Sequence, residues 1–186
     1  MEGDAPVSLM FINHGKVKTY KTNEDGKELI TGLHKDGDFI GYTALMQDSN
    51  YNESAMALED TEISLIPKQD FYTLLYNNRD VANKFIRILS MDISENEERL
   101  LHLAYNTVRQ RVAEALITLA ERYSEQNPDQ LFSISREDLA NMVGTAPESV
   151  IRTLSDFKSE QVITIESSEI RIVDIERLKR IVKWNR

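Results

Sequence analysis

The residues of this chain best suited to chemistry lie in one short segment, SREDLANMVGTAPESVIR, which runs from Ser135 to Arg152. Glu148 and Arg152 are four residues apart, so a helix places both, together with Ser149, on one face. In the major groove of DNA an arginine can donate two hydrogen bonds to guanine O6 and N7, and a glutamate can accept one from the cytosine amino group. The spacing therefore favours a helix that reads neighbouring base pairs.

The same segment is typical of two helices joined by a tight turn. We expect a first helix from Arg136 to Met142 and a second from Pro147 to Lys158, with Gly144 allowing the turn between them. Ala140 is small enough for the two helices to cross closely. This is the pattern of a helix-turn-helix.

Two pairs of residues have the spacing of helix caps. Ser135 with Asp138 stands at the start of the first helix, and Thr145 with Glu148 at the start of the second. Taken singly, Glu148 is as well explained by the cap, and Arg152 by a solvated surface charge. Together, on the exposed face of the second helix and before a wing, they favour base contact. The predicted DNA-binding residues are Arg136 (to phosphate), Thr145, Glu148, Ser149 and Arg152.

The chain around this segment completes a winged domain. A helix is expected over 108–123, ended by Asn127-Pro128-Asp129, and a short strand over 132–134. Alternating polarity over 162–165 and 169–173, with Glu166-Ser167-Ser168 between them, predicts a hairpin, which is the wing. Asp174 is then expected to cap a last helix.

The first third of the chain has the pattern of short antiparallel strands. Asn23-Glu24-Asp25-Gly26 predicts a hairpin turn between 16–21 and 28–33, because Asp-Gly readily supplies the positive φ of tight turns. In residues 61–65, Ile63 and Leu65 alternate with polar residues, which predicts a strand with these two on its buried face.

A long helix is expected over 81–104. Its apolar side chains recur three and four residues apart, as in a heptad seam. The stripe packs either on the protein's own β domain or on a second copy of the helix; its length and the polar residue within it favour a parallel dimer, with Asn96 setting the register. The predicted interface residues are Ile86, Leu89, Ile93, Asn96, Leu100 and Leu103.

Composition limits the classes of function. The net charge of −9 argues against a protein that coats nucleic acid without selection, although residues 132–186 are neutral, with nine Lys and Arg against nine Asp and Glu. The absence of cysteine excludes disulfides, thiolate nucleophiles and cysteine-ligated metals. No apolar run approaches the roughly 20 residues that cross a bilayer, so we expect a cytoplasmic protein without membrane contact.

An enzyme is the first alternative. The three histidines, at positions 14, 34 and 102, are scattered, and Glu97 and Glu98 are adjacent rather than convergent, which suits a solvated helix face. Nothing else suggests a nucleophile, a metal cluster or a phosphate loop. We therefore expect no enzymatic activity, no catalytic or metal-binding residue and no cofactor. The second alternative is a winged helix that contacts protein rather than DNA.

Residues 148–152, Glu-Ser-Val-Ile-Arg, resemble the recognition core of the CRP/FNR family of bacterial transcription regulators, to which the catabolite activator protein belongs. Leu103-Ala104-Tyr105 with Arg111-Val112-Ala113 is similar to that family's hinge, and residues 37–41 resemble its β-roll signature. The resemblance covers nearly the whole chain. Family members often carry arginine where this chain has Pro147, which suggests a different preferred site.

The resemblance implies an α+β fold: an N-terminal antiparallel β-roll (a cyclic-nucleotide-binding-like jelly roll) over 1–80, a long dimerisation helix and hinge over 81–106, and a C-terminal winged helix-turn-helix over 107–186. It implies a sequence-specific regulator that binds a two-fold operator in double-stranded DNA as a homodimer and works with RNA polymerase. In relatives one or two elements precede the strand that here begins near Val7, so we expect the β-roll to be truncated at its start.

The resemblance also identifies an effector pocket. Relatives that bind cyclic nucleotides hold the ribose with a Gly-Glu pair and the phosphate with an Arg-Ser/Thr-Ala run. Here the matching residues include Tyr42, Glu53 and Ser54, with Asn96 where relatives reach the base. A carboxylate in place of the guanidinium repels the phosphate. We therefore expect no response to cyclic AMP, and the sequence identifies no other effector.

Overall fold

The computed structural model describes residues 1–123, 131–166 and 169–183. The expected helix end at Asn127-Pro128-Asp129 and most of the expected wing turn, Ser167-Ser168, lie outside these residues. The chain divides into two compact units, 1–97 and 98–186. Within the described residues, no helix is both long and apolar enough to cross a membrane.

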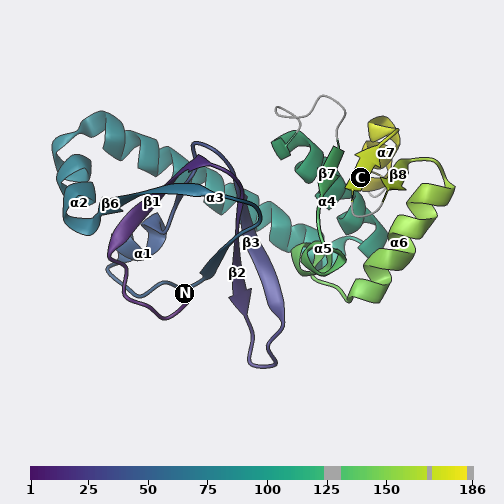
Figure 1. The fold of residues 1–186 in the computed structure, drawn as a ribbon, viewed down its shortest axis with the longest axis horizontal. Coiled ribbons are helices and arrows are strands. Elements are labelled where there is room, and N and C mark those ends of the chain that lie inside the picture. Colours follow the sequence, from purple (N-terminus) through teal and green to yellow (C-terminus); the bar gives the residue numbers. More distant parts are fainter. Residues whose placement is uncertain (124–130, 167–168, 184–186) are drawn as a thin grey trace. The chain divides into compact units, whose positions relative to one another are not determined.

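The first unit is built from antiparallel strands. Two three-stranded sheets have the orders β4-β1-β6 and β3-β2-β5. The elements are β1 (Ser8–His14), β2 (Val17–Thr22), β3 (Glu28–His34), β4 (Phe39–Ile40), α1 (Tyr42–Gln47), β5 (Ser54–Ala57), β6 (Glu62–Pro67) and α2 (Lys68–Asn77) (Figure 1). The expected β-rich domain is confirmed.

The hairpin turn between β2 and β3 forms where it was predicted. Thr22 pairs with Glu28, and the side-chain oxygen of Asn23 accepts hydrogen bonds from the backbone N–H groups of Asp25 and Lys27 at 3.1 and 2.8 Å. Gly26 has a φ of 78°, which a residue without a Cβ adopts readily. A local side-chain interaction thus fixes the turn.

The prediction of a buried face on β6 was wrong. The strand exists, but Ile63 is 37% exposed and Leu65 is 64% exposed. β6 is the terminal strand of its sheet, so only one of its edges is paired. Alternation reveals the period of a strand, whereas burial depends on what other elements cover it.

Aromatic side chains form the core around which the first unit packs. The ring of Phe85, from the long helix α3 (Arg79–Tyr105), lies 5.1 Å from that of Phe71 and 5.9 Å from that of Tyr42. Leu9 and Leu45 complete this buried cluster. Phe85 thereby anchors the first part of α3 to the β-rich unit.

The apolar stripe of α3 is narrower than the sequence suggested. Leu89 packs in part against the core of its own unit, and Leu103 is half-buried. Ile86, Ile93 and Leu100 are 59%, 60% and 66% exposed. These three lie seven residues apart, so they form one continuous line along the helix.

In its described residues, the second unit contains four helices besides the end of α3, together with a small sheet. Its elements are α4 (Val108–Tyr123), β7 (Leu131–Ser133), α5 (Arg136–Val143), α6 (Pro147–Ser159), β8 (Ile163–Glu166), β9 (Glu169–Ile172) and α7 (Ile175–Lys183) (Figure 1). The antiparallel sheet has the order β7-β9-β8. The predicted helix-turn-helix and the two strands after it are therefore confirmed.

One backbone position in the second unit is strained. Gln161, just after α6, has a φ of 59° and an exposed side chain. A left-handed backbone conformation costs a residue with a Cβ about 1–2 kcal/mol. Glycine avoids this cost, but it loses more conformational entropy on folding, which offsets part of the gain. Gln161→Gly should therefore raise the free energy of unfolding by about 0.5–1 kcal/mol, measured by urea denaturation. Gln161→Ala, which keeps the Cβ, is the control; an equal gain in both variants would contradict the explanation.

Candidate nucleic-acid interface

Helix α5 begins at the predicted cap. The Ser135 hydroxyl oxygen accepts a hydrogen bond from the Asp138 backbone N–H at 2.9 Å, and the hydroxyl donates to the Asp138 carboxylate at 2.7 Å. At the other end of α5, Gly144 has a φ of 64°, and the Thr145 N–H donates to the Ala140 carbonyl at 3.1 Å. The turn expected between the two helices is therefore present.

The capping pair predicted for α6 is not formed. The residue before the helix is Ala146, and no side chain caps it. Pro147 is the first helical residue, where its fixed φ suits the helix and its missing N–H costs nothing. The helix thus starts at Pro147, as expected, but the capping position falls on Ala146, so Thr145 lies one residue outside it and Glu148 acts only as an acidic group in the first turn.

Removal of the Ser135 hydroxyl should lower the stability of the protein, and removal of the Thr145 hydroxyl should not. We expect Ser135→Ala to lower the free energy of unfolding by about 1 kcal/mol, because an N–H at the start of α5 loses its acceptor. The matched variant Thr145→Ala should change it far less. Chemical denaturation of both variants measures the difference, and equal losses would show that α6 is capped after all.

One face of α6 is buried and the opposite face is open. Val150, Leu154 and Phe157 are at most 1% exposed. Glu148 and Arg152 are exposed, and Ser149 is half-buried, with its carbonyl accepting from the Thr153 hydroxyl at 2.8 Å. Neither Glu148 nor Arg152 forms a side-chain hydrogen bond or ion pair within the part of the chain that the structure describes. Their charged groups are thus available to a ligand.

Arg136, at the start of α5, is less accessible than its sequence position suggested. Its side chain is partly buried, and its Nη1 atom is buried without a hydrogen-bond partner among the described residues. Partial burial limits how far the guanidinium can extend. Its contact with phosphate stays a prediction.

Two arginines hold the turn between α5 and α6. Arg111 of α4 donates from Nη1 to the carbonyl of Val143 at 2.8 Å, and Arg99 of α3 donates from Nη2 to that of Met142 at 3.2 Å. Cations are favourable at a helix C-terminus, where the last carbonyls have no partner within the helix. Burial lowers the pKa of Arg99, but a guanidinium remains charged. These contacts fix the turn from which α6 starts.

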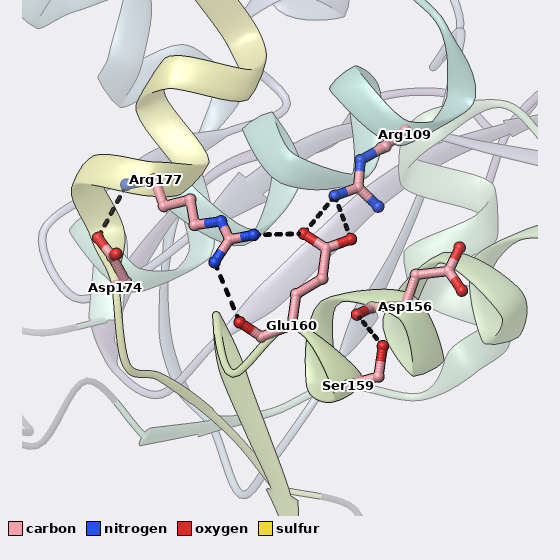
Figure 2. A network of polar contacts seen from close by, with 6 residues as sticks. All are labelled: Arg109, Asp156, Ser159, Glu160, Asp174 and Arg177. Carbon is pink, nitrogen blue, oxygen red and sulfur yellow. Dashed lines mark hydrogen bonds and ion pairs between the residues drawn. The ribbon is translucent and has the colours of Figure 1, made fainter.

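A carboxylate holds the other end of α6. Glu160 follows the helix, and both of its carboxylate oxygens accept from Nη2 of Arg109, on α4, at 2.7 and 2.8 Å. Arg177, on α7, donates from Nη2 to Oε2 of Glu160 at 3.1 Å and from Nη1 to its carbonyl at 3.2 Å. Figure 2 shows the three side chains meeting from three helical segments. Sequence reasoning missed all of these residues, because nothing local marks partners that are 51 and 17 positions away.

The proposed effector residues lie in the first unit. Tyr42 is nearly buried and donates a hydrogen bond to the Asp92 carboxylate; burial and the nearby carboxylates of Asp92 and Glu53 raise its pKa. The Glu53 carboxylate accepts from the Thr31 hydroxyl at 2.5 Å. This part of the unit is therefore acidic.

The other two effector candidates are not joined to this acidic group. Ser54 is buried, and its hydroxyl oxygen accepts from the Glu2 N–H at 3.0 Å. Asn96 is exposed on α3. Among the described residues no group of three His, Asp or Glu side chains is placed to hold a metal ion.

Two domain families match the chain. Residues 1–78 match the cyclic nucleotide-binding domain, and residues 110–181 match the Crp-like helix-turn-helix domain. The first contains the two β-sheets, and the second contains the helix-turn-helix with the strands that follow it.

Several curated proteins are similar over most of their length. The transcriptional activator protein Anr of Pseudomonas protegens is 28% identical over 176 residues, which are 93% of this chain and 72% of that protein. The transcriptional regulatory protein btr of Bordetella pertussis is 28% identical over 185 residues, or 97% of this chain and 76% of btr. The fumarate and nitrate reduction regulatory protein of Vibrio cholerae is 28% identical over 92% of this chain and 70% of its own length.

Solved structures share the fold. FixK2 from Bradyrhizobium japonicum superposes with a TM-score of 0.83 at 22% identity, covering 97% of this chain and 91% of FixK2. TTHB099, a CRP-family regulator from Thermus thermophilus, gives 0.84 at 20% identity over 98% of this chain and 91% of its own. At these identities the likeness establishes the architecture alone.

Proposed function

The chain belongs to the CRP/FNR family of DNA-binding transcription regulators, and we propose that it binds a two-fold operator as a dimer and reads the base sequence with α6. The observation that carries the proposal is the open face of that helix, where Glu148 and Arg152 have no partner within the described protein while Val150 and Leu154 are buried behind them. Both side chains are exposed to water, so neither carries the free-energy cost of an unpaired buried charge. Base edges of DNA can replace the water molecules that now solvate them.

Each residue of this face has a proposed role. Arg152 donates two hydrogen bonds to a guanine, and Glu148 accepts one from a neighbouring cytosine. Ser149 and Thr145 lie nearer the start of the helix, where hydroxyl groups commonly bind phosphate or base. Arg136 contributes a phosphate contact that fixes register without reading sequence.

The dimer is proposed to form through α3. The line of Ile86, Ile93 and Leu100 leaves large apolar side chains in water, which a second copy of the same helix would cover. Asn96 is expected to set the register of the paired helices. A two-fold dimer presents two copies of α6, which suits half-sites about one helical turn of DNA apart.

The cyclic nucleotide-binding domain is proposed to respond to something other than cyclic AMP. Glu53 stands where relatives bind the phosphate, and its carboxylate is already paired with Thr31. Tyr42, where relatives carry the glutamate that holds the ribose, is occupied with Asp92. The carboxylate of Glu53, in the place where relatives carry arginine, opposes a phosphate.

Millimolar cyclic AMP should therefore leave the melting temperature and the DNA affinity unchanged. A ligand at a hundredfold excess over its dissociation constant stabilises the native state by about 2.7 kcal/mol, which thermal unfolding detects easily. Saturable stabilisation by the nucleotide would contradict the proposed acidic pocket.

We further propose that the protein acts in the cytoplasm and contacts RNA polymerase. The support is that relatives such as Anr are named transcriptional activators. No residue is assigned to this contact.

Selection of bound sites from random duplex DNA tests the proposal. We expect a two-fold symmetric site, with affinity that falls linearly against the logarithm of salt concentration because bound phosphates release counterions. A winged domain that contacts protein instead would enrich no sequence and show no such slope.

A further inference from the structure

We propose that Glu160 is a positioning residue for DNA reading: it fastens the C-terminal end of α6 to α4 and α7, and so sets the angle at which Glu148 and Arg152 meet the bases. The inference rests on the proposed function, in which α6 is the reading helix. It assigns a role in sequence discrimination to a residue that lies beyond the end of that helix.

The geometry of α6 makes its far end important. The helix has 13 residues, which is about 20 Å at the usual rise. Its start is fixed by the turn at Gly144, which Arg111 holds from α4. The buried side chains of α6 hold it against the core, but a bidentate contact tolerates displacements of only about 0.5 Å or 10–20°, so polar contacts at both ends are needed to fix the direction of the helix this closely. The Glu160 contacts supply the second fixed point.

The contacts of Glu160 form a network rather than an isolated surface ion pair. Its side chain is 31% exposed and receives hydrogen bonds from Arg109 and Arg177, which belong to different helices. The guanidinium of Arg109 also lies 4.5 Å from the centre of the ring of Phe157, a fully buried residue of α6. Asp174 accepts from the Arg177 backbone N–H at 2.9 Å and fixes the start of α7 (Figure 2). Networks of this kind hold geometry where isolated surface pairs do not.

Glu160 also offsets the positive charge of the two arginines that it binds. While it is ionised it neutralises part of the charge on Arg109 and Arg177, and without it both guanidinium groups are free to attract phosphate at any sequence. Its loss is therefore expected to have two effects on DNA binding. Discrimination falls because the reading helix loosens, and non-specific affinity rises because the net charge becomes more positive.

The test compares Glu160→Gln with Glu176→Gln. Both substitutions remove one carboxylate from the same unit, but the carboxylate of Glu176 pairs, among the described residues, only with Lys179 of its own helix, at 3.4 Å. The ratio of the dissociation constant for a scrambled duplex to that for the selected site is measured across a salt series. We expect both variants to raise non-specific affinity alike, and Glu160→Gln alone to lower the ratio about tenfold. An equal ratio in the two variants would overturn the proposal.

Hydrogen exchange supplies a readout without DNA. The N–H groups of Gln161 and Val162 donate to carbonyls of α6 at 3.0 and 2.9 Å, so Glu160→Gln should speed their exchange and Glu176→Gln should not. Faster exchange with an unchanged ratio of dissociation constants would mean that Glu160 stabilises the end of α6 but does not affect sequence discrimination, which overturns the proposal. If the wild type itself preferred no sequence, the proposed function would fail; preference retained by both variants refutes only the role of Glu160.

A second variant separates positioning from direct contact and remains available if Glu160→Gln folds poorly. Arg177→Gln removes the contacts between Arg177 and Glu160, and it should also lower the ratio of the dissociation constants for scrambled and selected duplex. In the double variant Glu160→Gln/Arg177→Gln, the losses should not add, because both substitutions break the same connection. Additive losses, with a salt slope reduced by about one, would show that Arg177 binds phosphate itself and would contradict the proposed mechanism.

Discussion

Arg152→Ala should remove most of the protein's preference for its operator while leaving its fold and its dimer unchanged. Each lost bidentate contact to guanine costs about 1–3 kcal/mol, and a two-fold complex loses two of them. Because Arg152 is exposed and unpartnered in the described protein, its removal should cost little in stability. Competition binding against scrambled duplex measures the affinity, and repeated site selection measures the preference, which should relax at one base pair in each half-site.

Lys158→Ala is the matched control for this prediction. Lys158 is exposed on the same helix and carries the same charge, but it lies in the last turn of α6, away from the reading residues. Its loss should weaken all sequences alike. Arg136→Ala should also weaken all sequences and reduce the salt slope by about one. If Arg152→Ala left both affinity and preference untouched, α6 would not be the reading helix.

Ile93→Asp should convert the dimer into monomers and lower operator affinity by at least a hundredfold. Ile93 is central in the exposed line on α3, so a dimer through that line brings two carboxylates together in an apolar contact, which costs several kcal/mol. Light scattering at micromolar concentration should give twice the 21.4 kDa of one chain for the wild type and the mass of a single chain for the variant.

Met91→Asp tests whether position on the helix, rather than the new charge, causes the change. Met91 is 62% exposed on the same helix, two residues away and therefore on a different side. We expect this variant to remain a dimer and to bind the operator as the wild type does. A wild type that is monomeric under these conditions would refute the proposed interface, and two monomeric variants would place the interface more broadly over α3.

Features set by neighbours in the chain could be predicted from the sequence. The Asn23-to-Gly26 turn, the Ser135 cap and the Gly144 turn each depend on one side chain or one backbone angle within a few residues, and each is present in the structure. Asp174 likewise caps α7, with its carboxylate accepting from the Arg177 N–H. The helix-turn-helix follows from these signals together with the apolar pattern between them.

The one local prediction that was wrong shows how two signals compete. Thr145 and Glu148 have the spacing of a capping box, but Pro147 is the first residue of the helix and shifts the cap to Ala146. Proline has a stronger effect than a weak side-chain cap, because its φ is fixed by a covalent ring.

Features set by distant parts of the chain could not be predicted. The exposure of Ile63 and Leu65 and the partial burial of Leu89 depend on which elements meet, and periodicity does not report that. The Glu160 network joins residues 51 and 17 positions apart. Ion pairs of this separation are visible only once the helices are placed.

A double-mutant cycle in which one of the two changes is made in the DNA shows whether Arg152 on α6 reads a guanine in each half-site. The selected operator is synthesised with 7-deazaguanine at the symmetric guanine of both half-sites, which removes the N7 acceptor and leaves base pairing intact. The wild type and Arg152→Ala are then each measured on both duplexes. The expected result is that the modified base weakens binding by the wild type at least tenfold and has no effect on Arg152→Ala, because the variant no longer donates to N7. Equal losses for both proteins, at every guanine of the half-site, would contradict it.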